Sequence, residues 1–181
     1  YNIEDLGTYP LPNRTKTHLV LYSLFTHSPY FVNKYSSKRL DEILQRLINQ
    51  WQPTAIHFDT ICLTGFSNLL QPNIKNVASV NDSYTLTLDN EISNSHLGFW
   101  RKWYKRYQLK VVRKYELKTY QKFDVVHVVS QMDADALVSI GVNTEIAVIP
   151  NGVSHLIHPQ NIQNNPGDLL FVAKLGSDNL S

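Results

Sequence analysis

The sequence has few of the residues that mark several common classes of protein. Cys62 is the only cysteine among 181 residues, so no internal disulfide can form and a reducing compartment is expected. The seven glycines are all isolated, so the chain has neither the GxGxxG fingerprint of a dinucleotide-binding turn nor a Walker A loop. No apolar run approaches the roughly 18 residues that a membrane-spanning helix needs. The sequence therefore argues against a disulfide scaffold, a P-loop enzyme and a spanning segment.

Residues that could carry metal or thiol chemistry are also sparse. His155 and His158 form an HxxH pair, but no cysteine or carboxylate cluster lies near them, and structural zinc takes four such ligands. His57, Asp59 and Cys62 lie close in sequence, but no feature of the sequence activates the thiol. A histidine at a strand end and a buried cysteine are the simpler interpretation. We expect no metal and no cofactor.

Charge is present as a local excess. The formal net charge is +2, yet residues 99–123 hold nine Lys or Arg and one acid, Glu116, which gives +8. The rest of the chain therefore holds eight basic and fourteen acidic residues, which gives −6. The stretch interleaves basic and aromatic side chains, in the order GFWRKWYKRYQLKVVRKYELKTYQKF. Such a pattern suits a nucleic-acid contact, a membrane-docking surface or the solvated face of a helix.

Hydrophobic spacing predicts helices that alternate with strands. One helix is SSKRLDEILQRLINQW, which Ser36 or Ser37 caps and Pro53 stops. From Trp100 to Phe123, aromatic and aliphatic residues recur at i, i+3, i+4 and i+7, so one stripe of a long helix is expected to face partly into the domain. A further helix is QMDADALVSI, which ends at the following glycine. The stretch TKTHLVLYSLF fits a buried strand or a helix equally.

Four short apolar runs predict strands. They are TAIHFDTICL, IKNVASVND, DVVHVVS and EIAVIP. The third run is so continuously apolar that we expect cover on both faces of the sheet. Strands that alternate with helices in this order predict a parallel α/β sheet.

Polar residues follow each of these strands. In an open parallel sheet, ligands bind in the crevice outside the carboxyl ends of the strands. Each such residue alone more often caps a helix, but four polar ends at one edge favour a binding cleft. The candidates are Asp59 and Thr60, then Asn81, Asp82 and Ser83, then Ser130 and Gln131, then Asn151 and Gly152.

The ordered segments FDVVHVVSQMDADAL, IAVIPNGV and LLFVAKLG resemble glycosyltransferases of the GT-B fold, of the retaining type called group 1 or family 4. In that family a strand ending in Ser, an acidic helix, a strand ending in Pro-Asn-Gly-Val and a linker precede the strand that opens the second domain. The segment KVVRKYELKTYQKFD is similar to the family's basic segment with its Tyr-Glu pair, and VNDSYTL is similar to its acceptor-loop segment. The resemblance covers about residues 29–180.

The resemblance implies a Rossmann-like parallel sheet flanked by helices, the N-terminal half of a GT-B fold, in truncated form. Residues 1–152 would be the acceptor-binding domain without the family's opening strand and glycine-rich loop, residues 153–167 the interdomain linker, and residues 168–181 the first strand of the donor-binding domain. Asn81 stands where many members have His, and Ala173 replaces the usual glycine. The Glu-x7-Glu segment that grips the donor sugar lies in the second domain, so no catalytic residue is named and the fragment alone is expected to be inactive.

The resemblance also implies a reaction. A sugar would move from a nucleotide-sugar donor to a hydroxyl of a saccharide or lipid-linked acceptor, without a metal, in the synthesis of cell-envelope or extracellular polysaccharide or glycolipid. Lys174 would face the donor diphosphate, whose departure is the barrier. The acceptor would contact Asn81, Asp82 and Ser83. The cleft and hinge would include Asp59, Ser130, Asn151 and Gly152, since Asn-Gly permits a positive φ in a tight turn.

The basic stretch adds an expectation about membranes. Trp and Tyr favour the membrane interface, and each basic residue near an anionic surface contributes about 1 kcal/mol. A cytoplasmic protein, peripheral on the inner face of the cell membrane, is therefore expected. The docking residues would be Arg101, Lys102, Lys105 and Arg106. The alternative is a non-enzymatic module that binds membrane or nucleic acid, but no nucleic-acid reader fold is recognised and the acidic remainder would repel phosphates.

Overall fold

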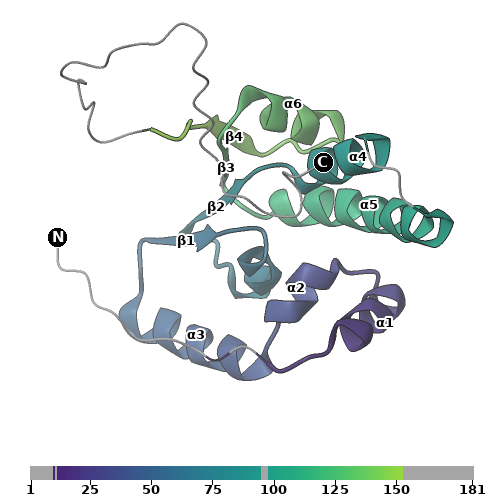
Figure 1. Ribbon diagram of the computed structural model, residues 1–181. Helices are drawn as coiled ribbons and strands as arrows, with labels where there is room; N and C mark the ends of the chain where they lie inside the picture. The colour runs from purple at the N-terminus through teal and green to yellow at the C-terminus, as the bar shows by residue number, and fades with distance from the viewer. Residues whose placement is uncertain (1–9, 11, 95–97, 153–181) are drawn as a thin grey trace, which may run out of the picture. The chain divides into compact units, whose positions relative to one another are not determined.

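The computed structural model describes residues 10, 12–94 and 98–152 (Figure 1). The chain divides into two compact units, residues 1–151 and residues 152–181, and the description below concerns the first unit. The expected linker and the strand after it, with His155, His158, Ala173 and Lys174, lie outside the described residues.

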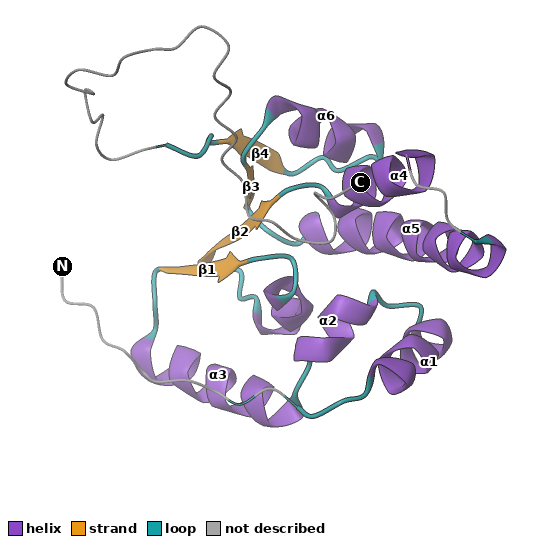
Figure 2. Ribbon diagram, in the orientation of Figure 1, coloured by secondary structure: helices purple, strands orange, loops and turns teal. Residues whose placement is uncertain are grey.

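From β1 onward, helical segments separate the strands of the first unit, as the sequence predicts (Figures 1 and 2). In chain order the elements are α1 (Lys16–Thr26), α2 (Tyr30–Tyr35), α3 (Lys38–Trp51), β1 (Ala55–Asp59), the 3-10 helix η1 (Leu63–Leu69), β2 (Lys75–Asn81), α4 (Tyr84–Asn94), α5 (Phe99–Tyr120), β3 (Val125–Val128), α6 (Gln131–Ser139) and β4 (Glu145–Val148).

The helix ends explain two points that the sequence left open. The segment TKTHLVLYSLF forms helix α1, and the Thr15 hydroxyl caps it by accepting a hydrogen bond from the amide of His18 at 3.3 Å. Helix α3 is capped by Ser37, whose hydroxyl accepts from the amide of Leu40 at 3.3 Å. At its other end Gln52 adopts a left-handed conformation, which ends the helix before Pro53.

The four strands form one all-parallel sheet in the order β1-β2-β3-β4. One row across it consists of Phe58, Ala78, Val126 and Ile146. The first three of these side chains are buried and the fourth is half-buried. This row faces the core, and Figure 1 shows helices α4, α5 and α6 along one side of the sheet. The sheet, flanked by helices, confirms the predicted α/β fold class.

Burial of β3 alternates along the strand, contrary to the prediction of cover on both faces. Val126 and Val128 are fully buried, whereas Val125 and His127 are half-buried. Successive residues of a strand point to opposite faces. In the next row, His57 and Glu145, which lie on β1 and β4, are exposed. An uninterrupted apolar run therefore did not identify the less buried face.

Helix α5 follows its predicted stripe only in its second half. Val111, Val112 and Thr119 are buried, whereas Trp100 and Trp103 are exposed, so the stripe faces only partly into the domain. The helix has 22 residues and so is about 33 Å long, whereas the strands have four to seven residues. Its first turns extend beyond the sheet, where no core exists to cover them (Figure 1). No helix among the described residues is both long enough and apolar enough to cross a bilayer.

Candidate functional site at the carboxyl edge of the sheet

The structure brings the predicted strand-end residues to one edge. Because all four strands are parallel, their carboxyl ends meet there. Asp59 ends β1 and Asn81 ends β2, while Ser130 and Asn151 follow β3 and β4 within three residues. Asp59 and Asn151 are exposed, and Asn81 and Ser130 are half-buried. This edge is the candidate functional site.

Two neighbouring strands end in backbone conformations that are uncommon for residues other than glycine. Thr60, directly after β1, has φ of 73°, and Asn81, at the end of β2, has φ of 64°. The amide of Asp82 donates to the carbonyl of Val80 at 2.8 Å, which closes a three-residue turn around Asn81. The amide of Thr60 is held by the carbonyl of Ser79, also at 2.8 Å. Such conformations are unfavourable by about 1–3 kcal/mol and cluster at binding sites.

The loop after β2 separates a solvent-facing acid from a capping hydroxyl. Ser83 is fully buried, and its hydroxyl accepts a hydrogen bond from the amide of Leu86 at 3.3 Å, so Ser83 caps α4. Asp82 is exposed, and its carboxylate makes no hydrogen bond or ion pair with the described part of the chain. Of the two roles open to Asp82, helix cap or ligand contact, the structure gives the cap to Ser83.

Asp133 of α6 joins this loop to the end of β3. One carboxylate oxygen accepts from the buried amide of Ser83 at 2.8 Å, and the other accepts from the Ser130 hydroxyl at 2.5 Å. In return the Ser130 hydroxyl accepts from the amide of Asp133 at 3.2 Å, which caps α6. A buried acid therefore fixes the loops after two adjacent strands relative to each other.

Glu116 of α5 binds the start of α4, directly after the same loop. It is fully buried, and its carboxylate accepts from the amide of Tyr84 at 2.8 Å, from the amide of Thr85 at 3.2 Å and from the Thr85 hydroxyl. These amides belong to the first turn of α4, where backbone donors lack helical partners. Burial raises the pKa of Glu116 to about 7, although the hydrogen bonds from Thr85 and Tyr84 favour the carboxylate and oppose the rise.

Two tyrosines of α5, Tyr115 and Tyr120, are also largely buried and have raised pKa values. Tyr115 shares a hydrogen bond of 2.9 Å with the Thr64 hydroxyl of η1, and burial raises the pKa of Tyr115 to about 12. Tyr120 is fully buried, and burial, with the nearby Glu116 carboxylate, raises its pKa well above its usual value. Burial of Glu116 itself is the reason that ionisation of its carboxyl is unfavourable despite its three hydrogen bonds.

His127 of β3 forms hydrogen bonds on both sides, to β2 and to the residue just after β4, near the carboxyl edge of the sheet. Its Nε2 lies 3.1 Å from the carbonyl oxygen of Ile149, just after β4, and therefore donates to it. Its Nδ1 then accepts from the hydroxyl of Ser79 on β2 at 2.6 Å.

Sequence reasoning missed His127, Asp133 and Glu116. The Ser130-x-x-Asp133 spacing of a capping box and the single acid in the basic stretch were the available signals.

The remaining predicted site residues have simpler surroundings. Asn151 and Gly152 are exposed, and neither has the positive φ that the Asn-Gly pair allows. Of the four expected docking residues, Arg101 and Arg106 are exposed, whereas Lys102 and Lys105 are half-buried. The Lys105 ammonium also forms an ion pair of 2.5 Å with Glu91 of α4. Among the described residues, no three His, Cys, Asp or Glu side chains gather as a metal site requires.

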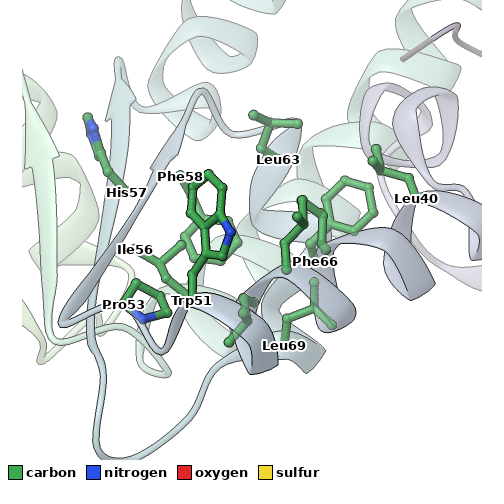
Figure 3. A pocket seen from close by; sticks show the side chains of 12 residues that line it. Leu40, Trp51, Pro53, Ile56, His57, Phe58, Leu63, Phe66 and Leu69 are labelled. Carbon is green, nitrogen blue, oxygen red and sulfur yellow. The ribbon is translucent and has the colours of Figure 1, made fainter. Parts of the chain in front are cut away.

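A cavity of about 390 Å³ lies between α3, β1 and η1 (Figure 3). Its lining is almost entirely apolar and includes Trp51, Ile56 and Phe58. The imidazole of His57 points away from these side chains (Figure 3). Sugars are bound through many hydrogen bonds, and a cavity without convergent donors and acceptors does not supply them. The candidate site is therefore the polar edge of the sheet and not this cavity.

An all-parallel sheet flanked by helices is a Rossmann-like fold, consistent with one half of a GT-B glycosyltransferase. The model of Glycosyltransferase Family 4 matches residues 9–155. The chain belongs to this family, which confirms the resemblance seen in the sequence. Comparisons with curated proteins and with solved structures found no match.

Proposed function

We propose that this domain forms the acceptor side of a retaining glycosyltransferase that moves a sugar from a nucleotide-sugar donor to a hydroxyl group. The family match supports a glycosyltransferase-type domain. The observation that carries the more specific proposal is the loop at Asn81–Ser83, where buried acids on two helices hold the backbone and leave the Asp82 carboxylate exposed, without a partner in the part of the chain that the structure describes. A free carboxylate on a fixed loop is suited to bind a sugar hydroxyl.

Asp82 would act by orientation. An ionised carboxylate accepts hydrogen bonds from hydroxyl groups, and a charge-assisted hydrogen bond is about twice as strong as a neutral one. Asn81 would present its amide beside it, while Ser83, which is buried, would position the loop without touching the acceptor. Correct placement of the attacking hydroxyl replaces a bimolecular encounter by a unimolecular step, which accounts for much of the rate in such reactions.

The donor would be held from the other side of the cleft, with Asp59, Ser130, Asn151 and Gly152 near the rim. We assign the donor diphosphate to Lys174, whose ammonium would offset the charge that develops as the diphosphate leaves. The acceptor would be a saccharide or a lipid-linked sugar of a cell-envelope or extracellular polysaccharide or glycolipid, and no metal would take part. Residues 153–167 would form the linker about which the two sides close and exclude water.

The test is transfer itself. The full-length protein is incubated with a panel of nucleotide sugars and with saccharide and lipid-linked acceptors, and release of nucleotide and formation of glycoside are both measured. We expect one donor to give a glycoside with the anomeric configuration of the donor, which nuclear magnetic resonance would establish. Inversion of configuration would refute the retaining mechanism. A complete lack of transfer across donors and acceptors would refute the proposed function.

A further inference from the structure

Helices α1 and α5, which are joined through Tyr107, both expose large apolar side chains. On α1 these are Leu21, Tyr22 and Phe25, with exposed fractions of 51%, 47% and 83%, and on α5 they are Phe99, Trp100 and Trp103, with 76%, 77% and 53%. We call these six residues the α1/α5 surface. Large apolar side chains gathered on the outside of a domain often mark a binding surface.

The outward face of α1 is apolar where a water-facing helix would be polar. Leu19 and Ser23 are buried on its inner face, while Leu21, Tyr22 and Phe25 lie at i, i+1 and i+4 on the opposite face. After Lys16, at its start, the helix contains no charged residue. A helix that is apolar on both faces has a partner on each, since one face alone suffices for packing on the domain.

Hydrogen bonds connect α1 to the N-terminal half of α5. The Tyr107 hydroxyl donates to the carbonyl of Ser23 at 3.2 Å, and the Gln108 amide donates to the Ser23 hydroxyl at 3.1 Å. Trp103 stacks on Tyr107 with ring centroids 6.3 Å apart. The ring of His27, at the end of α1, lies edge-on to Tyr107 at 6.5 Å. Tyr107 therefore connects Trp103 of α5 to the C-terminal end of α1.

Basic side chains extend this surface along α5. Arg106, Lys110 and Arg113 are exposed and follow Trp103 at intervals of three, four and three residues, so all four share one face of the helix. The only acid within α5 is the buried Glu116. On the adjacent helix α4, Glu91 is paired with Lys105 and Asp89 is exposed. The result is an apolar, aromatic end with a cationic flank.

We propose that the α1/α5 surface docks on an anionic lipid bilayer, with its six apolar side chains at the headgroup boundary and Arg106, Lys110 and Arg113 above the phosphates. Trp and Tyr prefer this boundary, and helices with apolar and basic groups arranged in this way lie along it without crossing it. A nucleic acid would match the basic residues but not the uncharged, apolar face of α1. A second copy of the chain would match the apolar residues but not the basic ones, whereas an anionic bilayer matches both. Docking is independent of the proposed transfer, because it needs neither donor nor acceptor.

The test is cosedimentation of the chain with vesicles made of equal parts phosphatidylglycerol and phosphatidylcholine, and with vesicles of phosphatidylcholine alone. One variant carries Phe25→Ser and Trp100→Ser, and its control carries Met132→Ser and Val138→Ser, which change exposed apolar residues of α6. A second variant carries Arg106→Glu, Lys110→Glu and Arg113→Glu. Its control carries Lys38→Glu, Arg39→Glu and Arg46→Glu on α3, which changes the net charge by the same amount. Every changed side chain is exposed, and circular dichroism checks that each variant is folded.

We expect the wild-type chain and both controls to sediment with the anionic vesicles and to stay in the supernatant with phosphatidylcholine. Each basic residue near an anionic surface contributes a factor of about five, so the triple charge variant should bind about 100-fold more weakly. The Phe25→Ser, Trp100→Ser variant should also lose at least tenfold. Raising the salt toward about 1 M, where the Debye length is about 3 Å, should release the wild type.

Fluorescence separates docking from simple adsorption of charge. Lipids with brominated acyl chains should quench Trp100 and Trp103 on binding, and Trp100→Ser with Trp103→Ser should remove that quenching although Trp51 remains. Wild-type chain that stays in solution with anionic vesicles at low salt would overturn the proposal. Equally weakened vesicle binding by the α3 charge control would show that binding depends on net charge alone, and would also overturn the proposal. Self-association that Phe25→Ser and Trp100→Ser abolish, without vesicle binding, would make the surface an interface between copies. Tighter binding to a DNA duplex than to vesicles would also contradict it.

Discussion

The buried carboxyl of Glu116 makes the stability of this domain depend on pH in an unusual direction. Its pKa is raised from the ordinary value of 4.5 to about 7. A carboxyl whose pKa is higher in the folded than in the unfolded chain favours folding while it is protonated in both states, below pH 4.5. That contribution is lost as the pH rises through about 7. At about 1.4 kcal/mol for each pH unit between the two values, the loss is about 3 kcal/mol.

The substitution Glu116→Gln isolates this effect, because the amide keeps the shape of the side chain and does not ionise between pH 4 and pH 8. At low pH the variant should be less stable than the wild type by about 1–3 kcal/mol. The reason is that the NH2 group of the glutamine side chain is a donor and cannot accept the hydrogen bond that the amide of Thr85 donates to Glu116. As the pH rises from 4.5 to above 7, the variant should gain about 3 kcal/mol relative to the wild type. The two stability curves therefore converge or cross near neutral pH.

Urea unfolding, followed by circular dichroism at a series of pH values, measures the difference between the two proteins. Glu42→Gln, on the exposed surface of α3, removes the same group from a solvated site and is the control for loss of one carboxyl. If the difference between wild type and Glu116→Gln stays constant from pH 4 to pH 8, burial does not raise the pKa of Glu116. The reasoning about the site would then have to be abandoned.

Two further substitutions test the packing around the candidate site. A Cβ atom on Gly65 would lie 2.7 Å from Cγ1 of Val32, so Gly65→Ala should destabilise the domain by about 1–3 kcal/mol, and an unchanged melting temperature would contradict this packing. Asp133→Ala leaves the buried amide of Ser83 without its acceptor and should lower the free energy of unfolding by about 1–3 kcal/mol. Hydrogen exchange should then accelerate at the loop after β2, and equal acceleration everywhere would instead indicate global loss of stability.

The parallel sheet was predictable because its signals are local. Apolar runs, helix caps and prolines act within a few residues, so α3, α6 and the four strands were identified, and the cap at Ser37 follows from hydrogen bonding within one turn. The parallel order then placed the four polar strand ends at one edge. Helix α1 was left open because a short apolar run has the same composition whether it forms a strand or a helix.

The buried acids of the site could not be predicted, because their role depends on contacts between distant segments. Glu116 meets Tyr84 and Thr85 across about thirty residues of sequence, and Asp133 meets Ser83 across fifty. Spacing along a helix shows which residues share a face, but not that a carboxylate on that face will find amides on another helix. The exposure of Trp100 and Trp103 likewise depends on where the sheet ends. The spacing of apolar residues along the helix carries no information about that position.

The proposal that this domain positions a sugar acceptor rests most directly on Asp82. The decisive measurement is the steady-state kinetics of transfer by the full-length protein with Asp82→Asn, beside Asp89→Asn as a control that alters an exposed acid of α4. Loss of a charge-assisted hydrogen bond should lower kcat/KM for the acceptor about 10- to 100-fold, with donor affinity unchanged. The melting temperature should also stay unchanged, because the Asp82 carboxylate has no partner among the described residues. Wild-type kinetics in Asp82→Asn, or a loss that merely follows a lower melting temperature, would contradict the acceptor role.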